Sequence, residues 1–188
     1  IFAVKLGDTE TAARQLIPMI GPETRILTLQ NGIDSVDLIT PHVGGAKVCG
    51  GVIYVSAVID RPGVIRSPGG LHVIVADAAH GDPVMADFFA ACARAMALDA
   101  KPSDAIAVTL WEKFIALTSL SGTTSLLRAS MGQILAHPET RILQRQLVDE
   151  AVAVGRAAGK VARTDLSDEI MAKLAGMPYA FRSSMSED

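Results

Sequence analysis

Residues 25–39 read RILTLQNGIDSVDLI, and this stretch decides the fold class. Its apolar beginning predicts a buried strand over residues 25–29, and the residues from 33 to 39 are compatible with a helix. Gln30-Asn31-Gly32 ends the strand between them. A buried strand that runs directly into a helix is the unit from which parallel sheets with crossover helices are built.

The same pattern continues on both sides of this stretch. Upstream, residues 1–4 form a short apolar run, and residues 9–20 have the apolar spacing of an amphipathic helix. Downstream, residues 48–59 predict one long strand, and residues 64–66 and 71–75 predict two more, in a region that resembles a β-hairpin at a sheet edge. The first hundred residues therefore predict an α/β domain.

The second half of the chain is expected to be helical, because alanine-rich segments at helical spacing replace the strand signals. Lys101-Pro102-Ser103 forms a natural boundary, since proline disfavours helix in the residue before it and serine is a good N-cap. We expect two domains, residues 1–101 and 102–188. The expected helices cover residues 84–98, 104–120, 123–128, 139–158 and 165–175.

The amino-acid composition excludes several classes of protein. The chain has 188 residues, of which 49% are hydrophobic, 20% charged and 4% aromatic, with a formal net charge of −3. It is too hydrophobic for a disordered chain, and it lacks the basic surface and aromatic platforms that nucleic acids need. No apolar run reaches the ~20 residues that span a bilayer. Cys49 and Cys92 have no partner motif, and the histidines show no metal-ligand spacing, so we expect a cytoplasmic, reducing location and no metal.

Lys113 is the most informative charged side chain of the helical half. The positions three and four residues away hold no acidic residue: they are Thr109, Leu110, Ala116 and Leu117. Glu112 is adjacent, but neighbouring helical residues point in different directions. Apolar surroundings lower the pKa of a lysine and make it a candidate general acid for a developing alkoxide. The alternative is a structural lysine whose stem covers apolar surface.

Three other polar positions each have a functional and a structural interpretation. Asn31 stands at the carboxyl end of an expected parallel strand, where open α/β sheets bind ligands, but asparagine before glycine is also a common turn. Lys5 has the same location after the first strand, or is a solvated loop lysine. Ser121 shares a helical face with Lys113, and the Ser and Thr cluster of residues 118–125 either lines a pocket mouth or caps a helix end.

Several short segments, in this order along the chain, carry a family resemblance. They are Val4-Lys5 with Asp8-Thr9-Glu10, Leu29-Gln30-Asn31-Gly32, Gly50-Gly51-Val52-Ile53-Tyr54 running to Ala57, Pro62-Gly63-Val64-Ile65, Trp111-Glu112-Lys113 and Arg182-Ser183-Ser184-Met185. Together they resemble the ketopantoate reductase (2-dehydropantoate 2-reductase) family. The resemblance implies a partial Rossmann-type parallel sheet domain followed by an all-α C-terminal domain. It also implies reduction of the 2-oxo acid ketopantoate to pantoate with NADPH, a step of pantothenate biosynthesis.

The resemblance also assigns roles to residues. Lys113 matches the family's catalytic lysine, which protonates the ketone oxygen as hydride arrives from the nicotinamide. Lys5, Asn31 and Ala57 fall at positions that contact NADPH in the family. Ser184 matches a serine that helps to bind the substrate carboxylate.

Three positions depart from the family pattern. Where the best known members place asparagines one and two turns after the lysine, this chain has Leu117 and Ser121, and Met131 stands at a further asparagine position. Ser121 is expected to contact substrate in place of the asparagine, in a less polar pocket. Because such a pocket cannot strongly prefer a polar substrate, a related reductase of another 2-oxo acid is one alternative. A cofactor-binding regulator that has lost catalysis is another.

Two expectations concern what surrounds the chain. Since Ile1 already has the character of a buried strand, we expect the family's glycine fingerprint to precede it, and the family's second catalytic group, a glutamate, to follow Asp188. Apolar residues in the expected helix 139–158 indicate a possible homodimer, although they also suit a core: Ile142, Leu143, Leu147 and Val148.

Overall fold

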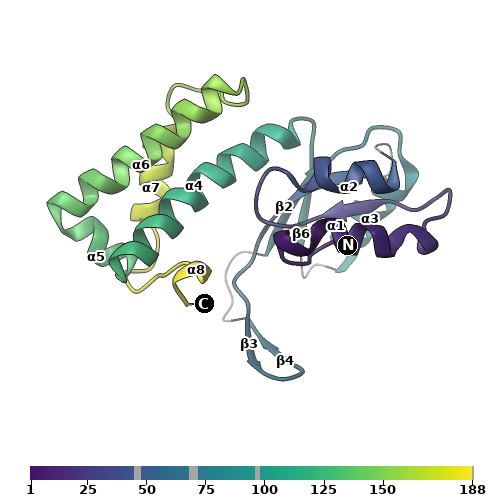
Figure 1. The fold of residues 1–188 in the computed structure, drawn as a ribbon, viewed down its shortest axis with the longest axis horizontal. Coiled ribbons are helices and arrows are strands. Elements are labelled where there is room, and N and C mark those ends of the chain that lie inside the picture. Colours follow the sequence, from purple (N-terminus) through teal and green to yellow (C-terminus); the bar gives the residue numbers. More distant parts are fainter. Residues whose placement is uncertain (45–47, 68–71, 96–97, 188) are drawn as a thin grey trace. The chain divides into compact units, whose positions relative to one another are not determined.

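The computed structural model describes residues 1–44, 48–67, 72–95 and 98–187. The chain forms two compact units, Ile1–Leu110 and Trp111–Asp188. The first holds a sheet with helices, and the second is helical (Figure 1). The predicted α/β class with a helical C-terminal region is therefore confirmed.

The sheet of the first unit has four strands in the order β1-β2-β5-β6. β1 pairs with β2 in parallel, β5 pairs with β6 in parallel, and β2 pairs with β5 antiparallel. Phe2 adds a parallel bridge to Thr28 on the free side of β1. The strands are β1 (Ile26–Thr28), β2 (Val48–Tyr54), β5 (Val73–Asp77) and β6 (Asp99–Ser103).

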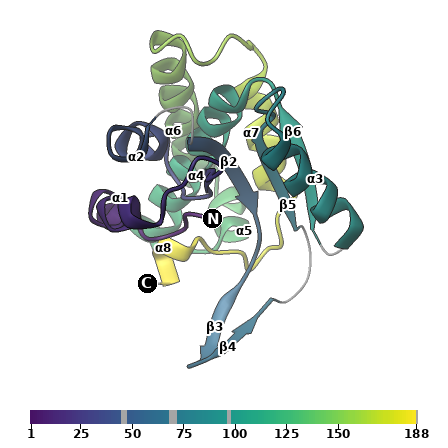
Figure 2. The ribbon, with the colours of Figure 1, turned by 90° about the vertical axis from the view of Figure 1, so that its right-hand side faces the viewer.

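Helices cover both faces of this sheet, as Figure 2 shows. Side chains of α1 and α2 pack with Ile26 and Val48, whereas the core on the other face joins Leu27 and Leu29 to Met85 of α3. Alternate β1 residues thus face opposite layers, as the period of a strand requires. The helical segments are η1 (Leu6–Asp8), α1 (Thr9–Leu16), η2 (Ile17–Met19), α2 (Ser35–Val43) and α3 (Pro83–Ala95).

The long strand predicted over residues 48–59 is wrong beyond Tyr54. The chain leaves the sheet there, and β3 (Val58–Arg61) pairs only with β4 (Val64–Arg66) in a separate two-stranded sheet. This hairpin projects from the first unit (Figures 1 and 2), and its facing residues Ile59 and Ile65 are 79% and 74% exposed. The apolar residues at the end of the predicted long strand therefore lie in an exposed hairpin.

Two further strand predictions need correction. The strand expected over 71–75 was placed at a sheet edge, but β5 lies between β2 and β6. β6 itself was missed, because Pro102 and Lys101 disrupt any apolar alternation. An edge strand tolerates a proline, which cannot donate to the ladder. Leu71, and residues 96 and 97 of the expected helix 84–98, lie outside the described residues.

The second unit is built on one long helix, α4 (Ile106–Leu127), where the sequence predicted two helices. The helix continues through Gly122 and the surrounding hydroxyl residues, and the hydroxyls of Thr123 and Thr124 donate to backbone carbonyls of the preceding turn. The other helices are α5 (Met131–Ala136), which was not predicted, α6 (Pro138–Ala157), α7 (Leu166–Ala175) and α8 (Ser184–Glu187).

The core of the second unit lies between α4, α5, α6 and α7. Ile115 of α4, Ile134 of α5, Val148 of α6 and Ile170 of α7 are all at most 2% exposed. Of the four residues of α6 named for a homodimer, Val148 thus belongs to this core, whereas Ile142 is 58% exposed. Among the helices of the described ranges, none is both long and apolar enough to cross a bilayer.

Candidate functional site

Lys113 lies in the second turn of α4 and is partly buried. Burial disfavours its charged form and lowers the pKa of the ammonium group from 10.5 to about 8. By helical spacing it shares a face with Leu117, Ser121 and Thr124, which follow at four, eight and eleven residues. A lysine with this pKa remains largely protonated at neutral pH and gives up its proton far more readily than a solvated lysine.

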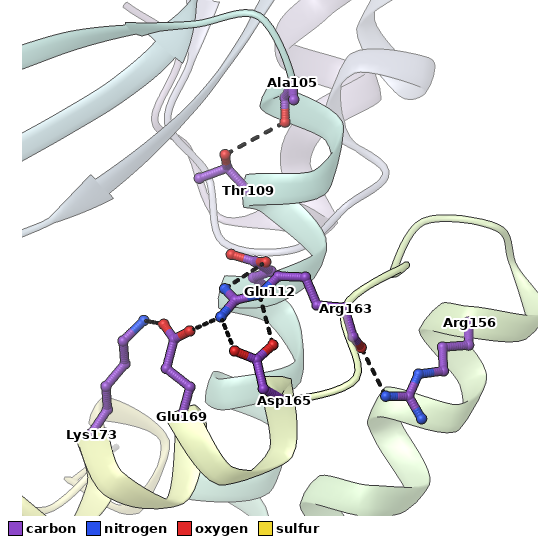
Figure 3. Close-up of polar contacts among 8 residues, drawn as sticks. All are labelled: Ala105, Thr109, Glu112, Arg156, Arg163, Asp165, Glu169 and Lys173. Carbon is purple, nitrogen blue, oxygen red and sulfur yellow. Dashed lines mark hydrogen bonds and ion pairs between the residues drawn. The ribbon is translucent and has the colours of Figure 1, made fainter.

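Glu112, the neighbour of Lys113 in the sequence, forms an ion pair with Arg163. Its carboxylate lies 3.5 Å from Nη1 of Arg163. The same guanidinium donates to both carboxylate oxygens of Asp165, at 3.1 and 3.0 Å, and to Glu169 (Figure 3). Glu169 also pairs with Lys173 of α7 at 2.5 Å. The carboxylate of Glu112 thus belongs to an ion-pair network with Arg163.

The segment before α8 is anchored on the Lys113 face of α4. The hydroxyl oxygens of Thr124 and Ser183 lie 2.7 Å apart, and both residues are buried. Ser184, the next residue, begins α8 and is exposed. Ser121 is one turn before Thr124 and partly buried. Ser121 is thus one helical turn from one partner of this buried hydrogen bond, and Ser184 directly follows the other partner.

Helix α5 fixes the same C-terminal segment from the other side. The backbone N–H groups of Met131 and Gly132, at the start of α5, donate to the carbonyls of Phe181 and Tyr179 at 2.9 and 3.0 Å. Ser130 and Gln133 complete a capping box. Two first-turn donors of α5 are thereby satisfied by the turn and irregular segment that lead to Ser184.

The Ser and Thr cluster divides between two environments. Thr118, Ser119 and Gly122 line a pocket of about 390 Å³ with Trp111 and Phe114 of α4 and residues of α6. This groove opens on a different face of α4 from Lys113. The interpretation of the cluster as a helix end is wrong, because α4 continues to Leu127.

In the first unit, Lys5 and Asn31 are exposed and lie on two neighbouring loops. The Lys5 loop follows the bridge of Phe2 to Thr28, and Asn31 follows the carboxyl end of β1. Gly32 has a φ of +109°, and a Cβ at this glycine would lie 3.4 Å from Leu6 of the Lys5 loop. The two loops therefore approach each other closely, and the position requires glycine because L side chains rarely adopt this backbone conformation.

Ala57, the third expected cofactor contact, has a separate location. It is exposed and lies between the end of β2 and the start of β3. Because β1 and β2 are parallel, the chain leaves β2 at the same edge of the sheet as Asn31. The base of the β3–β4 hairpin is closed by Ser67, whose hydroxyl donates to the carbonyl of Ser56 at 2.8 Å.

This edge of the sheet carries two exposed polar side chains. Asn31 follows the carboxyl end of β1 and Lys5 lies on the neighbouring loop, at the edge where open α/β sheets bind ligands. Within the described residues, no group of three or more His, Cys, Asp and Glu side chains is arranged to hold a metal ion.

Comparison with known proteins identifies the family. The model described as "Ketopantoate reductase PanE/ApbA" matches residues 1–79, and the model described as "Ketopantoate reductase PanE/ApbA C terminal" matches residues 105–188. Together they account for most of the chain, in the order that the two units have. The chain belongs to the ketopantoate reductase family.

Individual relatives are distant in sequence and similar in fold. The 2-dehydropantoate 2-reductase of Mesorhizobium japonicum is 25% identical over 208 residues, which cover 100% of this chain and 63% of the relative. The crystal structure of a PanE/ApbA family ketopantoate reductase from Ralstonia eutropha JMP134 has 26% identity and a TM-score of 0.85, covering 100% of this chain and 60% of that one.

A D-mandelate dehydrogenase solved with NADH and anilino(oxo)acetate shares the fold. It has 20% identity and a TM-score of 0.83, with coverage of 100% of this chain and 63% of that one. The chain therefore spans less than two thirds of the length of each of these proteins.

Two features of the candidate site were not predicted from the sequence. Ser183 was quoted only as part of a motif, and its buried bond to Thr124 joins residues 59 positions apart. Gln30 was passed over in favour of Asn31, although its side chain is buried at the strand end. The one sequence signal for Gln30 is its position: it is a polar residue directly after the apolar residues of a predicted strand.

Proposed function

We propose that this chain belongs to a nicotinamide-dependent reductase of 2-oxo acids, with NADPH as cofactor and ketopantoate as the first substrate to test. The observation that carries the proposal is Lys113, whose pKa burial lowers to about 8, in a chain of the ketopantoate reductase family. The reaction would place the protein in the cytoplasm, in pantothenate biosynthesis. We further propose residues 1–101 as the cofactor domain and residues 102–188 as the substrate domain.

Lys113 acts as the general acid in this proposal. The cofactor, when bound, supplies the hydride that reduces the carbonyl carbon. The ammonium group of Lys113 donates its proton to the carbonyl oxygen as negative charge develops there, and the neutral amine left behind is tolerated because the site already disfavours charge. Reprotonation from solvent completes the cycle.

The remaining residues bind and orient. We propose that Lys5, Asn31 and Ala57 contact the cofactor at the carboxyl edge of the sheet. Ser121 and Ser184 bind the substrate, with Ser184 donating to its carboxylate. The Thr124–Ser183 bond supports this arrangement, because it holds the start of α8 beside the face of α4 that carries Lys113.

A related substrate is the second candidate. Leu117, one turn after Lys113, is partly buried and packs against the core of the second unit, so it offers no hydrogen bond to a substrate hydroxyl. An apolar group at this position favours 2-oxo acids with apolar side chains. The D-mandelate dehydrogenase of similar fold was solved with anilino(oxo)acetate, which carries an aromatic ring.

The test is NADPH and NADH oxidation by the purified protein with a panel of 2-oxo acids. A preference for ketopantoate supports the first substrate, and a preference for phenylglyoxylate or a branched 2-oxo acid supports the second. Cofactor binding with no turnover of any panel member would favour an inactive regulator. Light scattering on the same sample tests the proposed homodimer, for which the exposed Ile142 of α6 is the supporting observation.

A further inference from the structure

Gln30 is a buried polar side chain at the candidate cofactor edge. It is 7% exposed, and it directly follows the buried run that contains β1. Its amide nitrogen donates to the carbonyl of Val4 at 2.9 Å and to Oγ1 of Thr9 at 2.8 Å. Its amide oxygen accepts from the hydroxyl of Thr28 at 3.1 Å. Both ends of the amide are therefore engaged.

Thr9 extends this set of hydrogen bonds into the Lys5 loop. It is 1% exposed, and its hydroxyl donates to the carbonyl of Leu6 at 2.7 Å while it accepts from Gln30. Within the loop, the N–H of Asp8 donates to the carbonyl of Lys5 at 3.0 Å. The amide of Gln30 thus holds the residue before Lys5 directly and the residues after it through Thr9.

A leucine or methionine at position 30 would satisfy the burial of this strand end equally well. Burying an amide is costly unless its polar atoms are bonded, and both bonds donated by the Gln30 amide nitrogen go to residues beside the Lys5 loop, while its oxygen accepts from Thr28 of β1. The beginning and the end of the Lys5 loop thereby acquire fixed places relative to Asn31, the residue after Gln30. Gly32 and Leu6 bring the same two loops into contact.

We propose that Gln30 is a positioning residue. It holds the Lys5 loop next to the Asn31 loop so that both loops can contact a nicotinamide dinucleotide. This role rests on the proposed function. Gln30 acts through the loop and does not touch the reacting atoms, so its loss should weaken cofactor binding and leave the chemical step unchanged.

Three variants test this role. Gln30→Met keeps the shape and removes the amide, Thr9→Val removes the relay hydroxyl without changing shape, and Thr9→Ser is the matched control that keeps the hydroxyl. Hydrogen exchange of residues 5–9 without cofactor reports the loop, and NADPH and NADH titrations report binding. We expect Gln30→Met and Thr9→Val to speed exchange and raise both Kd and the KM for cofactor about tenfold at unchanged kcat, while Thr9→Ser behaves as wild type.

Other results would overturn the proposal. Unchanged loop exchange in Gln30→Met would show that the amide does not hold the loop. Faster exchange with unchanged cofactor affinity would show that the loop position is irrelevant to binding. If the unmodified protein binds neither NADPH nor NADH, the proposed function fails together with the role of Gln30 in binding. If the unmodified protein binds cofactor and the variants bind it equally well, only the role of Gln30 fails.

Discussion

The hydroxyl groups of Thr124 and Ser183 lie 2.7 Å apart in the core of the helical unit, although 59 residues separate them in the chain. Thr124 also donates to the carbonyl of Leu120 at 2.8 Å, so it is fixed within α4 before it meets Ser183. This pair joins the helix that carries Lys113 to the start of the helix that carries Ser184.

Thr124→Val should therefore destabilise the protein and loosen the start of α8. The isosteric change leaves the buried hydroxyl of Ser183 without this partner, which costs about 1–3 kcal/mol. Thr118→Val is the matched control, since Thr118 of the same helix is exposed and its loss should stay within about 0.5 kcal/mol. Urea unfolding measures both, and equal effects of the two variants would contradict the role of the pair.

Two glycines of the helical unit should respond oppositely to alanine. A Cβ at Gly132 of α5 would lie 2.6 Å from the carbonyl oxygen of Tyr179, whereas a Cβ at Gly122 of α4 meets nothing within 4 Å. Gly132→Ala should push away the segment that leads to Ser184 and cost about 1–3 kcal/mol or more. Gly122→Ala should stabilise by about 0.5–1 kcal/mol, because alanine favours a helix. A Gly132→Ala protein as stable as wild type in thermal melts would refute this close packing.

Lys113→Met should stabilise the protein at neutral pH while strongly lowering the proposed activity. The pKa of Lys113 is lowered to about 8 from 10.5, so folding with a charged lysine carries a cost at pH 7. Between pH 8 and 10.5 the unfolded chain binds more protons, so the stability of the wild type rises with pH across this window. At about 1.4 kcal/mol per pKa unit, the gain from Lys113→Met is at most about 3 kcal/mol below pH 8 and disappears near pH 10.5.

Denaturation of wild type and Lys113→Met at pH 7 and pH 10 measures this difference. Lys160→Met is the control, since Lys160 is exposed and follows α6. A Lys113→Met protein that is less stable than wild type at pH 7 would show that the lysine serves the fold.

Strands β1, β2 and β5 of the first unit were predictable because they are apolar and largely buried, and its helix α1 because it is amphipathic. The β3–β4 arm was not, because Ile59 is as apolar as a core residue and yet 79% exposed. β6 was missed for the opposite reason, because its sequence is polar where a strand was not expected. Its place in the sheet comes from main-chain pairing with β5, and Lys101 and Pro102 give no sequence signal for that pairing.

The candidate site shows the same division between local and long-range information. Helical spacing alone was enough to predict that Lys113, Leu117 and Ser121 share one face, because all three lie on α4. Local spacing contains nothing about the bonds from Thr124 to Ser183 or from Gln30 to Val4, which join distant segments. These bonds become visible only once the chain is folded.

The pH dependence of 2-oxo acid reduction in wild type and Lys113→Met tests the central claim most directly. If Lys113 is the general acid, kcat/KM of the wild type falls as pH rises through about 8, the pKa to which burial lowers this lysine. Lys113→Met should lose about 10² to 10⁴ in kcat/KM and show no decline near pH 8. A Lys113→Met protein that reduces the same 2-oxo acid at the wild-type rate, with the same decline, would contradict the assignment.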